Sequence, residues 1–236
     1  MGNWRETKKK AITFSYDDGI TQDIRLIELL NKYGLKCTFN INSDLLGKDG
    51  MLDYYKGIRV SHYKIRAERL AEVYKGHEVA VHTLTHPNLK TCSDDEIVRQ
   101  VEQDRKKLSE LVGYEVIGMA YPFGSNATDE RVERIVREKT GVRYSRGTNC
   151  TERFDEQDDL IHFQPTVFHL DFDIMMDLAR KFVEMDPDEP QIFYIWGHTY
   201  EMDYSSDYWV RLEELFKLVS GRDDVFYGTN AEVLLK

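Results

Sequence analysis

The 236-residue sequence contains little cysteine, and its three cysteines, Cys37, Cys92 and Cys150, lie far apart. This spacing predicts neither a zinc knuckle nor a dithiol site. The sequence also lacks an apolar run near the roughly 20 residues that a membrane span needs. The charged residues at its start are not followed by the apolar stretch of a signal peptide. We therefore expect no membrane partner and a cytoplasmic location, or export if the sequence is a trimmed piece of a longer protein.

Positive charge is in deficit, because 32 lysines and arginines face 42 aspartates and glutamates for a net charge of −10. Such a chain repels phosphate backbones, so we expect no nucleic-acid partner. A hydrophobic content of 41% and a charged content of 31% are typical of a globular protein. The sequence contains no obvious linker, low-complexity tract or internal repeat, and we interpret residues 1–236 as a single domain.

Predicted strands and helices alternate along the chain about seven times. The predicted strands are 10–16, 35–42, 77–83, 115–122, 142–147, 161–167, 191–198 and 224–228. The predicted helices are 21–34, 64–76, 93–113, 128–141, 171–185, 204–221 and 230–236. We predict neither a helix nor a strand for the aromatic stretch 43–63. Alternation of this kind favours an α/β fold with a parallel sheet and outer helices, either a closed or nearly closed TIM-like barrel or an open doubly wound sheet.

Polar, titratable side chains follow five of the predicted strands. Because the carboxyl ends of parallel strands meet at one mouth, these residues are expected to converge there. The residues in question are Asp17, Asp18, His82, His86, the stretch 121–124, Arg146 and His198.

His82 and His86 stand in "HTLTH", after the apolar strand "EVAV". Pro87 disfavours helical dihedrals at His86, so the pair is expected at a strand end and the turn after it. Two imidazoles and one carboxylate would make a metal site with positions left open for water. The alternative is one core histidine and one surface histidine.

Asp17 and Asp18 would face opposite sides of a continuing strand, so both can serve one site only if the chain turns, as Gly19 permits. Two close carboxylates repel, and we expect a divalent metal to supply the compensating charge. One carboxylate would then bind metal while the other handles protons. A solvated Asp pair in a turn is the alternative. His198 could protonate a leaving group, or could be hydrogen-bonded to backbone.

These motifs together resemble the polysaccharide deacetylase family, carbohydrate esterase family 4. The family's first motif, T-F-D-D-G, stands here as "SYDDG", and its second, H-S/T-x-x-H, as "HTLTH". The third, R-x-P-Y-G, is partly matched by "AYPFG", and the fifth by "YIWGH". The motifs keep the family's order from Ser15 to His198, which is most of the chain.

The resemblance implies a distorted (β/α) barrel of about seven strands. It also implies that Asp18, His82 and His86 hold one divalent metal ion, most often zinc, with cobalt or nickel possible. Asp17 would be the general base that activates a water on that metal. The enzyme would be a hydrolase of carbon–nitrogen bonds that removes acetyl groups from N-acetylated carbohydrate, or from O-acetyl esters.

The resemblance further implies that the metal and the backbone N–H of Phe123 stabilise the oxyanion. His198 would protonate the departing amine. Tyr121, Phe123 and Trp196 are the predicted substrate contacts, and Tyr200 and Trp209 could also stack on sugar rings or belong to the core.

Two motifs depart from the family pattern. The third-motif arginine, which orients the base, falls on Ala120, and we expect Arg146 to replace it. The fourth motif, D-x-x-D-W, is not evident, and the candidates to support His198 are His169, Asp171 and Asp173. Two other functions therefore stay open: a hydrolase of small cytosolic amides or cyclic imides, and a carbohydrate-binding barrel without catalysis. The sequence leaves the carbohydrate, the metal and the oligomeric state undetermined.

Overall fold

A single curled parallel sheet forms the centre of the molecule. The computed structural model describes residues 3–54 and 57–235. Seven strands lie in the order β7–β6–β5–β2–β1–β9–β8, and β10 pairs with β1 beside β2. The strands are β1 (Lys10–Asp17), β2 (Cys37–Ile41), β5 (Glu78–Val81), β6 (Gly118–Ala120), β7 (Tyr144–Arg146), β8 (Val167–Phe168), β9 (Gln191–Gly197) and β10 (Val225–Tyr227).

One short segment brings the two edges of this sheet together. Phe163 accepts a hydrogen bond from the Gly147 N–H just after β7 (2.9 Å), while Val167 pairs with Ile195 of β9. The sheet therefore curls into a nearly closed barrel, which confirms the distorted barrel and excludes the open doubly wound sheet.

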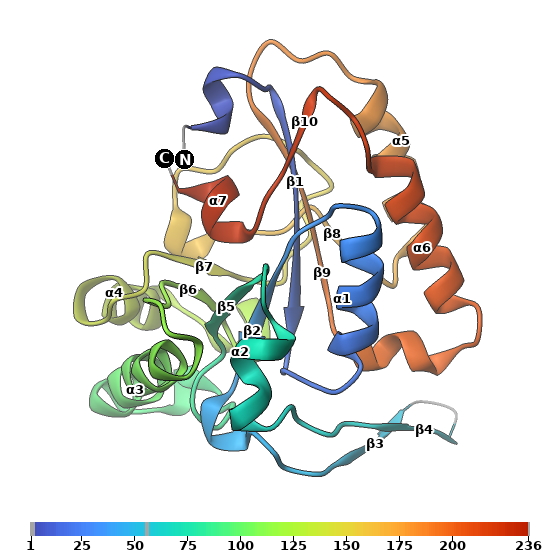
Figure 1. The fold of residues 1–236 in the computed structure, drawn as a ribbon. Coiled ribbons are helices and arrows are strands. Elements are labelled where there is room, and N and C mark those ends of the chain that lie inside the picture. Colours follow the sequence, from blue (N-terminus) through green and yellow to red (C-terminus); the bar gives the residue numbers. More distant parts are fainter. Residues whose placement is uncertain (1–2, 55–56, 236) are drawn as a thin grey trace.

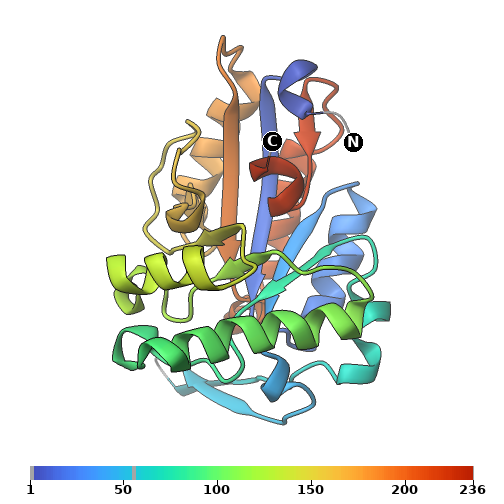
Figure 2. The same ribbon diagram turned by 90° about the vertical axis from the view of Figure 1, so that its left-hand side faces the viewer.

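Helices cover the outside of the curl (Figures 1 and 2). They are α1 (Asp23–Lys32), α2 (Leu70–Val73), α3 (Asp94–Val112), α4 (Glu130–Lys139), α5 (Phe172–Glu184) and α6 (Tyr208–Val219), whereas α7 (Asn230–Leu234) lies at the amino ends of the strands, where its Ala231 N–H donates to Glu78. The longest, α3, begins where Ser93 accepts from the Glu96 N–H and ends at Gly113 in the left-handed conformation. Among the described residues, no helix is both long and apolar enough to cross a membrane.

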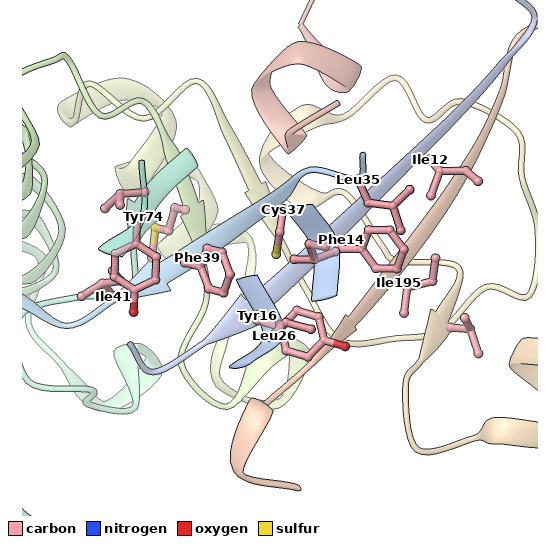
Figure 3. Close-up of a cluster of buried hydrophobic side chains, with 14 of the residues drawn as sticks. Ile12, Phe14, Tyr16, Leu26, Leu35, Cys37, Phe39, Ile41, Tyr74 and Ile195 are labelled. Carbon is pink, nitrogen blue, oxygen red and sulfur yellow. The ribbon is translucent and has the colours of Figure 1, made fainter. Parts of the chain in front are cut away.

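Alternate residues of β1 face different surroundings, as a strand requires. Ile12, Phe14 and Tyr16 belong to the apolar layer between the sheet and the outer helices (Figure 3). The residues between them face the inside of the barrel, where Thr13 donates to Asn230 (2.7 Å) and Asp17 meets side chains from other strands. The alternation that builds the core therefore also aims Asp17 into the barrel.

Three regions differ from the sequence-based prediction. The stretch 43–63 contains a hairpin of β3 (Met51–Tyr54) and β4 (Ile58–Ser61), which lies at the carboxyl end of β1 (Figure 1). The helix expected at 64–76 shortens to a 3-10 turn and α2. The strand expected at 161–167 is a 3-10 turn followed by the two-residue β8.

Candidate active site

The turn after β1 places both adjacent carboxylates on one site. β1 ends at Asp17, and Asp18 (φ +86°) and Gly19 (φ +63°) both take positive φ angles. A Cβ on Gly19 would also lie 3.1 Å from the Ile41 side chain, so this position favours glycine. The chain reverses at once, and Asp18 no longer points away from Asp17.

Asp17 is buried, and each of its oxygens accepts one hydrogen bond. Its Oδ1 accepts from Asn40 Nδ2 (2.8 Å), and its Oδ2 accepts from Arg146 Nη2 (2.5 Å). Burial alone would raise the pKa of Asp17, but Arg146, through its charge and its hydrogen bond, acts with the nearby His82 and His198 to outweigh burial, and the pKa of Asp17 lies below its usual value. The carboxyl is therefore ionised at neutral pH.

Arg146 is the last residue of β7 and reaches across the barrel to Asp17. Its side chain is fully buried, with the guanidinium carbon 4.6 Å from the centre of the Trp196 ring. Its Nη1 donates to the Gly147 carbonyl (3.0 Å). An arginine held on an aromatic face and bound to backbone has little freedom to leave the carboxylate it contacts.

His82 and His86 lie near Asp18, with one ligand atom from each of the three residues within 4.8 Å of the others. His82 Nδ1 donates to the Ala120 carbonyl (2.8 Å), which leaves Nε2 unprotonated for a metal. Burial lowers the pKa of His82 to about 4 and also lowers that of His86, so both imidazoles are neutral. Two neutral imidazoles and an ionised carboxylate fit a divalent metal such as zinc.

Asp18 already has cationic and hydrogen-bonding partners from the chain itself. His62 Nε2 lies 3.1 Å from its Oδ2, and Lys64 Nζ lies 3.3 Å from its Oδ1. Burial would raise the pKa of Asp18, but these two partners hold it well below its usual range. A cation near the two carboxylates was expected, and the chain itself supplies two, because Lys64 contacts Asp18 and Arg146 contacts Asp17. The metal site is supported by its donor atoms alone.

His198 follows β9, and its Nε2 lies 3.9 Å from Asp17 Oδ2. Its Nδ1 lies 3.2 Å from Glu201 Oε2, the same oxygen that pairs with His169 Nε2 (2.6 Å). Burial would lower the pKa of His198, but Glu201, Asp17 and Asp18 raise it to about 9. His198 is therefore protonated at neutral pH and can donate a proton.

The residue that supports His198 is thus Glu201, which sequence reasoning missed. His169 contacts Glu201 rather than His198, and Asp173 forms an ion pair with Arg211 (2.6 Å) at the surface. The signal was present in the sequence, since Glu201 stands three residues after His198. This is the spacing of a capping box, and the Glu201 carboxylate also accepts from the His198 backbone N–H (3.0 Å).

The predicted substrate contacts separate into two groups. Phe123 is 58% exposed, and the centre of its ring lies 4.6 Å from the centre of the His86 ring. Trp196 is half-buried beside Arg146. Tyr121 is buried and donates to the Ile161 carbonyl (3.0 Å), so its side chain belongs to the barrel wall and is not open to a substrate.

The two further aromatic residues also differ. Tyr200 lies 5.1 Å from the His198 ring, between centroids, at the edge of the site. Trp209 is a core residue of α6, buried, with its indole N–H donating to Asp203 (2.9 Å).

Known proteins share both the sequence pattern and the fold. Chitin deacetylase 1 of Cryptococcus neoformans is 28% identical over 156 residues, which cover 64% of this chain and 29% of that protein. Peptidoglycan-N-acetylglucosamine deacetylase PgdA of Listeria monocytogenes is 24% identical over 136 residues, which cover 56% of this chain and 24% of that protein. The chain thus spans under a third of the length of these curated relatives.

The fold is similar to that of a solved Bacillus anthracis protein, a mutant of a carbohydrate esterase family 4 pseudoenzyme with restored enzymatic activity. The TM-score is 0.59 at 20% identity, over 96% of this chain and 68% of that one. The family model for polysaccharide deacetylases matches residues 5–145, which is more than half of the chain. The protein therefore belongs to the polysaccharide deacetylase family.

Proposed function

We propose that this protein is a metal-dependent hydrolase that removes acetyl groups from N-acetylated or O-acetylated carbohydrate. The observation that carries the proposal is the arrangement around Asp17. A buried, ionised carboxylate lies between a set of metal-ligand side chains, Asp18, His82 and His86, and a protonated His198. A base, a metal site and an acid within one barrel mouth suit acetamide hydrolysis.

A divalent metal held by Asp18, His82 and His86 would supply Lewis acidity, lowering the pKa of water and polarising the acetyl carbonyl. Asp17 accepts the proton of the attacking water. Arg146 keeps the Asp17 carboxylate ionised and correctly oriented, since it donates to Oδ2 while Asn40 donates to Oδ1. Arg146 thus takes the place of the third-motif arginine, from the end of β7.

His198 donates a proton to the departing amine, and Glu201 keeps it protonated and aims the ring toward Asp17. The backbone N–H of Phe123 stabilises the oxyanion, and the positive φ of Phe123 (+59°) turns this peptide away from the regular strand. The exposed Phe123 ring and the half-buried Trp196 offer apolar surface to a sugar.

The first test combines bound-metal analysis with acetate release from N-acetylated chito-oligosaccharides. We expect close to one zinc per chain in the wild type, metal-dependent acetate release, and loss of both in His82→Ala. His77→Ala is the matched control. This histidine lies on the same chain segment outside the site, where its ring contacts Asn31 and the Cys37 N–H.

The outcomes separate the alternatives. Bound metal without acetate release would move the search to small amides, cyclic imides and esters. Stoichiometric metal and sugar binding with no turnover on any of these would support a carbohydrate-binding barrel. Absence of metal after reloading would contradict the proposal.

A further inference from the structure

The segment that follows the β3–β4 hairpin lies against the Asp18 turn. The Thr21 N–H donates to the Tyr63 carbonyl (2.8 Å), the Ile65 N–H donates to the Gly19 carbonyl (2.9 Å), and Ile20 and Lys64 form an antiparallel bridge. These backbone contacts fix residues 62–65 beside the turn. Side chains at 62 and 64 point to the same side of such a segment.

Both of these side chains contact the Asp18 carboxylate, one on each oxygen. His62 Nε2 lies 3.1 Å from Oδ2, and Lys64 Nζ lies 3.3 Å from Oδ1 and donates to the Asp18 carbonyl (2.8 Å). The Lys64 side chain is only 6% exposed and that of His62 18% exposed. A buried ammonium on a metal-ligand carboxylate is unusual, because it competes with the metal for the same negative charge.

The two contacts should act on a metal in opposite directions. His62 leaves a lone pair free on each Asp18 oxygen while it fixes the orientation of the carboxylate, as outer-shell donors do for metal ligands. Lys64 places a positive charge within a few ångströms of the position that Asp18, His82 and His86 surround, and so repels a dication.

We propose that residues 62–64 set the metal affinity of this site: His62 is a positioning residue that strengthens metal binding, and Lys64 is an internal cation that weakens it. When no metal is bound, Lys64 neutralises Asp18. The inference rests on the proposed metal site at Asp18, His82 and His86, and goes beyond it by assigning control of the affinity to the segment that follows the β3–β4 hairpin.

The test measures zinc dissociation constants of the purified, metal-stripped chain by competition with a chromogenic chelator. His62→Ala is expected to weaken zinc binding about 10- to 100-fold, and His62→Gln, which keeps an N–H donor, to restore most of it. Lys64→Met is expected to tighten binding by roughly tenfold or more, and Lys64→Arg, which keeps the charge, not to tighten it. Tyr63→Ala is the control, since the Tyr63 side chain is 42% exposed.

Opposite signs are the decisive result. If the segment only supported the fold, both His62→Ala and Lys64→Met would weaken binding, and that outcome, or no change in either variant, would overturn the inference while leaving the metal site intact. Failure of the wild type to bind zinc would instead contradict the proposed function and the inference together. Thermal unfolding of each variant checks its fold, and Lys64→Gln replaces Lys64→Met if the latter does not fold.

Discussion

The two ends of the barrel interior bury carboxylates with different partners: Glu78 at the amino end has neutral donors, and Asp17 at the carboxyl end has a cation. Near the amino ends of the strands, Glu78 accepts from Thr38 Oγ1 (2.8 Å), the Tyr144 hydroxyl (2.8 Å) and the Ala231 N–H of α7 (3.0 Å). All three donors are neutral, and burial raises the pKa of Glu78. At the carboxyl ends, Asp17 is also buried, yet its pKa is lowered.

The charge of the partners accounts for this difference. Neutral donors offset only part of the desolvation of Glu78, whereas Arg146 and the histidines more than offset that of Asp17. The neutral hydrogen bonds around Glu78 hold α7 across the amino end of the barrel, where the Asn230 N–H also donates to Thr38 (2.8 Å). The charged partners of Asp17 keep it ionised at neutral pH. Burial of an acidic residue is therefore not in itself a sign of chemistry, but burial against a cation beside metal-ligand side chains is.

The largest expected effect comes from exchanging each carboxylate for its amide. Asp17→Asn removes the proton acceptor and should lower kcat by about 10²- to 10⁴-fold while zinc remains bound. Glu78→Gln, the matched control at the other end, should leave kcat within a few-fold. Steady-state acetate release with metal analysis measures both. Equal losses in the two variants would show that Asp17 serves the fold rather than the reaction.

A smaller effect is expected from removing the cation that distinguishes the two ends. Arg146→Met leaves Asp17 buried without its main partner, which should cost about 3–5 kcal/mol in the free energy of unfolding. Because Arg146 lowers the pKa of Asp17, its loss raises that pKa, and the acidic limb of the kcat/KM profile should move to higher pH. Chemical denaturation and pH–rate profiles test this. Arg146→Lys should recover part of both effects, and an unmoved acidic limb would contradict the assigned role.

The smallest effect is expected on the pH dependence of activity, from removing the charge of Glu201 beside the proposed acid, His198. The carboxylate of Glu201 helps to raise the pKa of His198 to about 9, so activity should fall as the pH rises through that value. Glu201→Gln removes the negative charge and should lower the pKa of His198, shifting the alkaline limb to lower pH with zinc affinity unchanged. Asp173→Asn, on an exposed residue, should leave the profile as it is. An alkaline limb at the same pH in Glu201→Gln would remove Glu201 from the mechanism.

The sequence was informative wherever a local pattern had one physical meaning. Alternating strands and helices predicted a parallel sheet with outer helices, and left the choice between a barrel and an open sheet to the family resemblance. Pro87 and Gly19 predicted that His86 and Asp18 lie in turns, and both residues have positive φ angles. Period-two alternation along the first strand indicated that Asp17 and Asp18 can share a site only if the chain turns at Gly19. These features depend on residues close together in the chain, so the sequence alone determined them.

Tertiary structure decided which charges meet. Arg146 and Asp17 are 129 positions apart and were paired only through the resemblance to the family's third motif, while His62 and Asp18, 44 positions apart, were not paired at all. The sequence therefore suggested a metal as the compensating charge, whereas the folded chain supplies Arg146 and Lys64. Residue types and strand ends were set by the sequence, but the pKa of each group depends on distances of a few ångströms between strands, and only the folded barrel defines those distances.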